Sequence, residues 1–295
     1  MSVGAVVAPL QEPLSSTPRE RNGRRAARVI KIVALFVFVI FFLLPVVLLL
    51  LTSFKSLAEA DPSRAWQLPK TWTIDAWREA WSKLHTGLGN SFKLVIPATI
   101  ISVLLGSLNG FVLSRWRFPG ADLVFTLFLF GMFIPYQAVM IPLNMLFTDA
   151  SFSPGIPRLI AAHVVYGIPI TTLIFRNYYA TTVPNELIEA ARMDGAGMMR
   201  TYRSVILPAS PPAFVVAAIW QFTSIWNDFL FAVFLITNPN QWPVTVALNN
   251  TAGSQVTPFP VQMAGALIAS FPTLVVYILL GRYFMRGLMA GALKG

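Results

Sequence analysis

Residues 32–51 read IVALFVFVIFFLLPVVLLLL, and this stretch carries no charge. Lys31 and Lys55 are the nearest charged residues on either side. A helix needs about 20 mostly apolar residues to cross a bilayer, because each residue adds about 1.5 Å to its length. The stretch therefore predicts a membrane-spanning helix. It is longer than the apolar region of a signal peptide, which has about 7–15 residues, so we expect the helix to be retained.

The composition of the whole chain agrees with a membrane protein. Of its 295 residues, 56% are hydrophobic and only 12% are charged, whereas about 25% of the residues in a soluble domain are charged. The same hydrophobicity excludes a disordered chain. The chain has no cysteine, which excludes disulfides, thiolate metal sites and a cysteine nucleophile. We expect no catalytic residue and no metal site.

Five further apolar segments are long enough to be spans. We therefore expect an all-α, polytopic membrane protein with six transmembrane helices. Residues 1–28 are expected to form a cytoplasmic tail and residues 29–295 the transmembrane domain. The expected spans are 32–51, 94–113, 123–146, 159–175, 213–235 and 264–280.

The positions of the basic residues predict the orientation of the chain. An even number of spans places both termini on one side, and short loops rich in Lys and Arg stay in the cytoplasm. With the N-terminus inside, the larger share of the 22 Lys and Arg residues falls in inner segments. Both termini are therefore expected in the cytoplasm. Much of the net charge of +10 then reports topology rather than nucleic-acid binding.

Three features between and within the spans bear on packing. Gly106 and Gly110 form a GxxxG pattern, which favours close approach of two helices. Prolines inside the spans predict kinks. The expected outer loop, residues 52–93, is rich in tryptophan, which suits either the membrane interface or a docking surface for an outside partner. The prolines are Pro45, Pro97, Pro135, Pro142, Pro169 and Pro272.

The fifth expected span carries a group of polar residues. Gln221, Ser224 and Asp228 follow the spacing of one helical face, and Asn227 lies beside them. A carboxylate at membrane depth is costly and usually faces a bundle interior or a water-filled cavity. These four residues are therefore candidates for a translocation path. Hydrogen bonding between helices is the alternative interpretation.

The longest inner loop, residues 176–212, has local signals for a helix-turn-helix. Pro184 suits the start of a helix, and Glu186 and Glu189 favour its N-terminal half. Asp194-Gly195 is a turn signal that ends this helix. A second short helix is expected to follow. These signals predict a small docking element in the cytosol.

Residues 189–208 of this loop read EAARMDGAGMMRTYRSVILP. This pattern closely resembles the EAA loop of bacterial ABC importer permeases, which is EAA, three residues, G, nine residues and I-x-L-P; Val205 replaces the isoleucine. The segments LSRWRFPG (113–120), WND (226–228) and GALKG (291–295) are similar to those of the carbohydrate, MalG-type branch. The resemblance runs from about Ile30 to the end of the chain.

The resemblance implies the type I importer permease fold and a set of partners. It implies a second permease of the MalF type, two ATPase subunits, an extracytoplasmic sugar-binding protein and the lipid bilayer, with no nucleic acid. It implies that this chain binds no cofactor and that ATP and Mg are held by the ATPase subunits. In this interpretation the EAA loop is the coupling helix, and Lys294 and Gly295 also reach the ATPase. The implied coupling residues are Glu189, Ala190, Ala191, Asp194, Gly195, Leu207 and Pro208.

Two other functions remain as alternatives to a sugar importer subunit. A secondary transporter would carry titratable groups at mid-membrane and repeated halves, but Asp228 is the only carboxylate in an expected span. An importer permease for another solute, such as a polyol phosphate, would share the EAA pattern. The chain has no phosphate loop of the form GxxxxGK[ST], in agreement with ATP chemistry on a partner.

Overall fold

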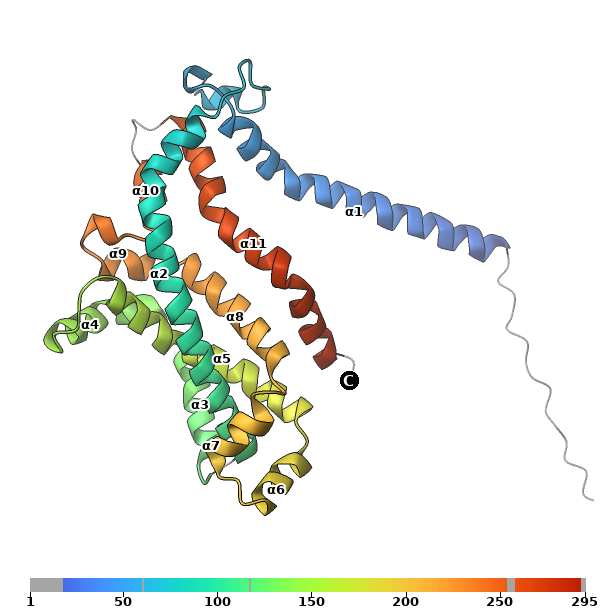
Figure 1. Ribbon diagram of the computed structural model, residues 1–295. Coiled ribbons are helices and arrows are strands. Elements are labelled where there is room, and N and C mark those ends of the chain that lie inside the picture. Colours follow the sequence, from blue (N-terminus) through green and yellow to red (C-terminus); the bar gives the residue numbers. More distant parts are fainter. Residues whose placement is uncertain (1–17, 60, 117, 254–257, 293–295) are drawn as a thin grey trace, which may run out of the picture. The chain divides into compact units, whose positions relative to one another are not determined.

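The computed structural model describes residues 18–59, 61–116, 118–253 and 258–292. Within these residues all regular secondary structure is helical (Figure 1). The chain divides into two compact units, residues 1–49 and 50–295, which are described separately. The expected all-α architecture is confirmed.

The first unit consists of most of helix α1 (Pro18–Ser53). The part Ala27–Ser53 is long and apolar enough to cross a membrane, as residues 32–51 predict. The helix begins at Pro18, inside the expected tail, and proline is well suited to the first turn of a helix.

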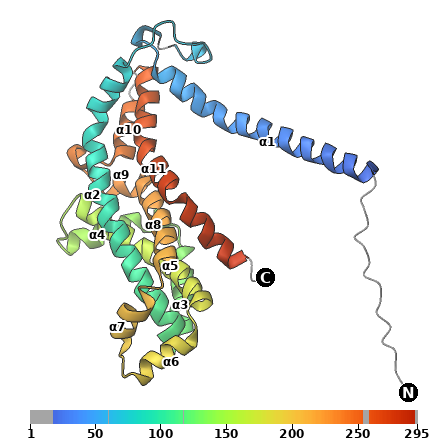
Figure 2. The same ribbon diagram turned by 45° about the vertical axis from the view of Figure 1, so that its right-hand side comes forward.

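The second unit is built around four helices: α2 (Asp75–Phe111), α5 (Ile156–Thr182), α8 (Pro211–Trp226) and α11 (Phe259–Ala292). Helix α2 packs against α5, α8 and α11, and α8 also packs against α5 and α11 (Figures 1 and 2). The contact between α2 and α5 is the most extensive of these. A π-helical turn, η3 (Val112–Trp116), extends α2. α2, α5 and α11 each contain a segment that is long and apolar enough to cross a membrane.

Helix α2 begins much earlier than expected. The predicted outer loop ended at residue 93, whereas the helix starts at Asp75. Polar residues such as Arg78, Glu79 and Lys83 lower the hydropathy of its first turns without interrupting the helix. The expected span was bounded at residue 94 because hydropathy reports membrane burial and does not report where a helix begins.

The third expected span is broken into α3 (Ala121–Met132) and α4 (Tyr136–Asp149), which are bent by 101° relative to each other. Pro135 lies at the break in an extended conformation. Proline lacks a backbone N–H and therefore cannot continue the hydrogen bonding of α3. Pro45, Pro97, Pro142, Pro169 and Pro272 lie inside helices instead.

The fifth expected span, 213–235, is also interrupted. Helix α8 ends at Trp226, and the separate helix α9 (Leu230–Leu235) follows. On its other side α8 is bent by 94° from the helical segment Met198–Ile206. Six candidate spans are obtained when Met198–Ile206 and α8 are counted together as one span, and α3 and α4 together as another.

The GxxxG pattern marks the closest approach of α2 and α5. A Cβ atom built on Gly106 would lie 2.2 Å from Thr171 Oγ1, and one built on Gly110 would lie 2.6 Å from the Phe175 Cβ. Only glycine fits at either position. The Thr171 hydroxyl donates to the backbone oxygen of Ser102 (3.1 Å) and so joins the two helices.

Two buried clusters make the core of the second unit. One contains Leu84, Leu159, Ile225 and Val244, and joins the first half of α2 to α5, α8 and helix α10 (Val244–Gly253). The other surrounds Phe111 and Phe175, where α2 and α5 end. The outward surfaces of α2 and α11 remain rich in exposed apolar side chains, as expected for helices that face lipid.

Residues 54–74 connect α1 to α2 through two short turns, η1 (Leu57–Glu59) and η2 (Pro62–Arg64). The buried Lys55 ammonium donates to the backbone oxygens of Arg64 (2.6 Å) and Ala65 (3.2 Å). The Glu59 carboxylate accepts the backbone N–H of Lys70 and of Thr71, and these bonds hold the pKa of Glu59 below its ordinary value. This segment lies at the opposite end of the second unit from α6 (Asn185–Met193) (Figures 1 and 2).

Gly110→Ala is expected to destabilise the second unit, because the new methyl group overlaps α5. Overpacking of this kind costs about 1–3 kcal/mol. Gly89→Ala is the matched control: Gly89 is also in α2, but nothing lies within 4 Å of its Cβ position. Thermal unfolding in detergent should show a lower midpoint for Gly110→Ala and an unchanged or higher midpoint for Gly89→Ala. Equal midpoints for the two variants would contradict the packing assigned to Gly110.

Candidate functional site

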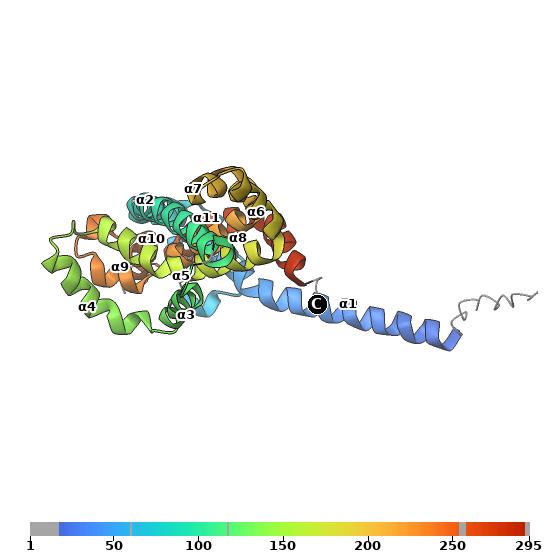
Figure 3. The same ribbon diagram turned by 90° about the horizontal axis from the view of Figure 1, so that it is seen from below.

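The expected helix-turn-helix is present in the inner loop. It consists of α6 (Asn185–Met193), the short helix α7 (Met198–Thr201) and the π-helical turn η4 (Tyr202–Ile206). Figure 3 shows the molecule from the end at which α6 and α7 lie. We call residues 185–208, from the start of α6 to the end of the EAA pattern, the EAA segment.

Gly195 terminates α6 in a left-handed conformation, with φ of 72°. Its N–H donates to the Arg192 oxygen (3.0 Å), and the Ala196 N–H donates to the Ala191 oxygen (2.9 Å). These two bonds form the Schellman motif, in which glycine is preferred because it has no Cβ. Nothing lies within 4 Å of its Cβ position, so the backbone conformation and not space requires glycine here.

The predicted coupling residues lie on the surface of this segment. All are exposed except Ala191, which is half-buried. The exposed surface also includes large apolar side chains. We call this set the apolar surface of the EAA segment. Its members are Leu187, Met193, Met199 and Leu207.

Hydrogen bonds between hydroxyl groups fix the EAA segment to the helices. The buried Ser107 hydroxyl of α2 lies 2.7 Å from Tyr179 Oη of α5 and 2.9 Å from Tyr202 Oη of η4. The Ser210 hydroxyl donates to Tyr179 Oη (3.0 Å). Ile188 of α6 is buried in the core cluster that surrounds Phe111 and Phe175. One buried network therefore joins α2, α5, the start of η4 and Ser210, the residue that precedes α8.

Arg115 joins η3 to the junction between α5 and α6. Its guanidinium donates to the backbone oxygens of Tyr179 (2.9 Å) and Ala180 (2.7 Å) and to the side-chain oxygen of Asn185. The carbonyl groups at the C-terminus of a helix attract a cation. Beside it, the Arg192 guanidinium of α6 lies 4.3 Å from the centre of the Trp116 ring.

Ser107, Arg115 and Tyr179 were not among the residues predicted for the site. Arg115 and Trp116 belong to the LSRWRFPG segment, so the family pattern contained a signal for them. Ser107 and Tyr179 are far apart in the sequence, and no local pattern indicates that they meet.

The polar residues expected on one face of the fifth span do not share one environment. Gln221 is buried and donates to the Ser102 hydroxyl (3.3 Å) and the His163 backbone oxygen (3.1 Å). Ser224 and Asn227 are exposed. Asp228 lies beyond the end of α8, so the helical spacing that grouped it with Gln221 does not apply. Gln221 therefore forms hydrogen bonds between helices, which is the alternative interpretation given for this polar face.

Asp228 organises the break between α8 and α9. Its carboxylate accepts the backbone N–H of Phe231 (3.4 Å) and of Ala232 (3.2 Å), at the start of α9. A side chain that satisfies these groups favours a new helix start over continuation of α8. On its other side, the buried His163 Nε2 of α5 lies 3.5 Å from Asp228 Oδ2. This carboxylate is therefore satisfied within the protein.

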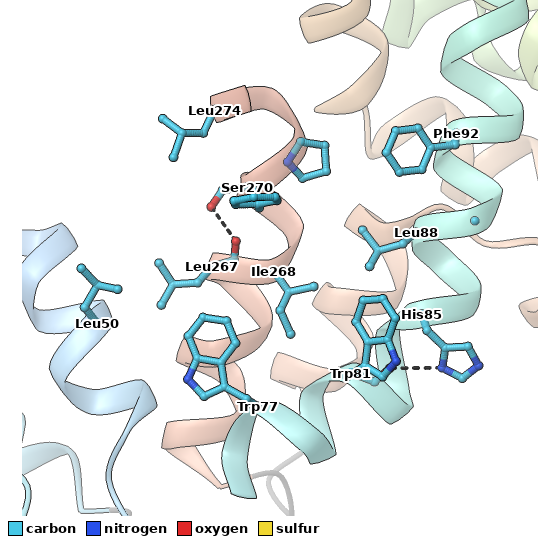
Figure 4. Close-up of a pocket in the computed structure, with 13 residues that line it drawn as sticks. Leu50, Trp77, Trp81, His85, Leu88, Phe92, Leu267, Ile268, Ser270 and Leu274 are labelled. Carbon is cyan, nitrogen blue, oxygen red and sulfur yellow. Dashed lines mark hydrogen bonds between the residues drawn. The ribbon is translucent and has the colours of Figure 1, made fainter. Parts of the chain in front are cut away.

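An apolar groove lies between the first half of α2 and α11, with a volume of about 850 Å³ (Figure 4). Trp77, Trp81 and His85 lie along α2, and Leu267, Ile268 and Leu274 lie along α11 (Figure 4). Its apolar lining suits hydrocarbon and does not suit a polar solute.

Comparison with known proteins assigns the chain to a family. Residues 102–289 match the family of binding-protein-dependent transport system inner membrane components. The chain is 35% identical to the xylose/arabinose import permease protein XacI of Haloferax volcanii, over 95% of this chain and 96% of that protein. It is 51% identical over 166 residues to a probable ABC transporter permease protein of Pyrococcus horikoshii, and that match covers 56% of this chain and 60% of the relative.

The chain therefore belongs to the binding-protein-dependent transport system inner membrane components. It is a multi-pass membrane permease, as the EAA pattern predicted. The fold is similar to a chain in the crystal structure of a bacterial ABC transporter involved in the import of the acidic polysaccharide alginate. The TM-score is 0.75 at 22% identity, over 92% of this chain and 100% of that chain. The expected importer permease fold is confirmed.

Gly195→Ala is expected to open the end of α6, because a Cβ disfavours the left-handed conformation by about 1 kcal/mol, or about fivefold in the opening equilibrium. Gly195→Asn is the control, since asparagine tolerates this conformation better. Hydrogen exchange of the Ala196 amide should accelerate in Gly195→Ala and change less in Gly195→Asn. The same exchange rate in the wild type and in Gly195→Ala would argue against the Schellman turn.

Asp228→Ala is expected to lower the free energy of unfolding by about 1 kcal/mol, the usual cost of losing a helix-capping side chain. Asp228→Asn keeps one acceptor oxygen and should lose less. Asn227→Ala serves as the neighbouring exposed control. Thermal unfolding should rank Asp228→Ala as the least stable of the three. If Asn227→Ala were equally destabilised, the structural role given to the carboxylate would be wrong.

Proposed function

We propose that this permease imports a sugar, with an extracytoplasmic binding protein supplying the substrate, and that its EAA segment couples import to ATP hydrolysis on partner subunits. Two observations favour a sugar. The relative XacI is named for xylose and arabinose, and the segments at 113–120, 226–228 and 291–295 resemble those of the carbohydrate branch.

The observation that carries the coupling proposal is the exposed apolar surface of the EAA segment on a rigid support. Met193 is 83% exposed and Leu187 is 49% exposed. Single exposed apolar residues are common, and the support for an interaction site is that four large ones fall within residues 187–207. The residues beneath it, from Ile188 to the hydroxyl network of Ser107, are buried and fixed. A force on α6 would therefore move α2 and α5 with it.

The proposed partners complete the transporter. A second, MalF-type permease would form the other half of the path, and two ATPase subunits would hold ATP and Mg. Ser224 and Asn227 are exposed, so they are the members of the predicted path that a passing solute can contact. Gln221 and Asp228 would support the path from within the protein. Lys294 and Gly295 remain a proposed second contact with the ATPase and lie outside the described residues.

We assign the EAA segment and both termini to the cytoplasm. The 54–74 segment, at the other end of the second unit, is then extracytoplasmic. Because the chain has no cysteine, single thiols can test this orientation. Ser63→Cys should react with a membrane-impermeant maleimide in right-side-out vesicles, and Met193→Cys should react only after permeabilisation. The reverse labelling pattern would overturn the orientation.

Met193→Asp is expected to abolish co-purification of the ATPase with the permease. The substitution places a charge on the apolar surface of the EAA segment without disturbing the core, since Met193 is almost fully exposed. Met193→Leu keeps an apolar side chain and should retain the ATPase. Both variants should insert and unfold like the wild type. A stable, ATP-hydrolysing complex with normal uptake in Met193→Asp would show that this surface does not couple the two subunits.

A further inference from the structure

A second cavity, of about 350 Å³, lies between the first half of α2 and the segment formed by η5 (Pro239–Gln241) and α10. It is separate from the EAA segment and from the predicted path residues. We call it the α2–α10 cavity. Its lining residues are Lys83, Thr86, Gly87, Pro239, Asn240, Trp242, Ala247, Asn250 and Thr251.

The lining of the α2–α10 cavity differs in kind from that of the apolar groove. It combines one half-buried indole, Trp242, with the exposed amides of Asn240 and Asn250. Hydroxyl groups of Thr86 and Thr251 add acceptors. Amide and hydroxyl groups both donate and accept hydrogen bonds, as sugar hydroxyls do. The Trp242 side chain packs in part against the core cluster that contains Leu84 and Val244, and its share of the lining adds the apolar surface that the C–H face of a sugar ring needs.

The charges around the cavity favour a neutral ligand. Lys83 is the one charged residue among the described residues of the lining, and its ammonium is 2.9 Å from the Glu79 carboxylate. This pairing weakens its attraction for an anion. Among the described residues no carboxylate lines the cavity, so that lining offers a cation no counter-charge. A polyhydroxylated, uncharged molecule fits this chemistry better than an ion.

The fold holds the cavity walls in place. The Asn90 amide of α2 donates to the backbone oxygens of Asn240 (2.8 Å) and Trp242 (3.1 Å). The Ser91 hydroxyl accepts the Val244 N–H (2.9 Å) at the start of α10. The Trp242 indole N–H donates to the Ile236 oxygen (3.2 Å), which fixes the ring. Within the described residues the Asn240 and Asn250 amides have no side-chain hydrogen bond and are available to a ligand.

We propose that the α2–α10 cavity is an external saccharide subsite that binds one sugar ring of the imported solute at the extracytoplasmic surface. The volume is near the lower limit of small-molecule sites, about 300 Å³, and suits a single ring. This inference rests on the proposed function, which supplies both the sugar and the orientation. The subsite would retain a sugar released from the binding protein close to the entrance of the path.

The test uses thiol protection on the complete transporter in proteoliposomes, without the binding protein. Thr86→Cys places a single thiol on the cavity wall, and Ser82→Cys, one turn earlier in α2 and exposed, is the control thiol. D-glucose, D-xylose and melibiose are the probes, with glycine betaine at equal osmolarity as the reference. At least one sugar should slow labelling of Thr86→Cys several-fold and leave Ser82→Cys unchanged.

A second substitution then tests whether the Asn250 side-chain amide contributes to sugar binding. Asn250→Ala added to Thr86→Cys should abolish protection by the sugar. Asn249→Ala should preserve it, because Asn249 is the adjacent exposed asparagine of α10 but does not line the cavity. Absence of protection by all three sugars, or equal protection with both alanine variants, would overturn the subsite.

Uptake measurements separate this proposal from the proposed function. If the wild-type transporter, supplied with its binding protein, imports a sugar that gives no protection, the subsite is wrong and the importer assignment stands. If no sugar is imported, the assignment itself fails. If Asn250→Ala only weakens the apparent affinity for the binding protein, with thiol protection unchanged, the surface is a protein contact and the saccharide subsite is refuted.

Discussion

The close approach of α2 and α5 is the constraint on which the rest of the second unit depends. Gly106 and Gly110 allow the backbones to meet where any side chain would overlap Thr171 or Phe175. Gly167 has the same function on α5, where a Cβ would lie 2.1 Å from Gln221 Nε2. Without these glycines, neither the Thr171 bond to Ser102 nor the Gln221 bonds to α2 and α5 could form.

The two surfaces for which we propose functions lie at different ends of this helix pair. At one end, Ser107, Tyr179 and Arg115 fix the EAA segment to α2 and α5. At the other, Asn90 and Ser91 fix η5 and α10 to the first half of α2. Because α2 is continuous from Asp75 to Phe111, it connects the proposed sites of sugar entry and ATPase contact. Such a continuous helix is suited to transmit a rigid-body movement between two surfaces.

The sequence predicted the features that depend on local chemistry. The start and end of α6 follow from Pro184 and Gly195, and the GxxxG pattern marked the contact of α2 with α5. Features that depend on competition between local and long-range interactions were missed. The expected fifth span ran through residues 227–229 without a break, whereas the Asp228 carboxylate accepts backbone N–H groups at the start of α9 and the helical register ends there. The predicted polar face assumed an unbroken helix, so it combined the buried Gln221 with residues in other environments.

The central claim is that transport through this permease is driven by ATP and supplied by a binding protein. The most direct measurement is sugar uptake into proteoliposomes that contain this chain, its second permease and the ATPase subunits. With binding protein outside and ATP inside, the sugar should accumulate, and removal of either component should stop uptake. Uptake that proceeds without ATP and binding protein, driven by a proton or sodium gradient, would contradict the account and indicate a secondary transporter.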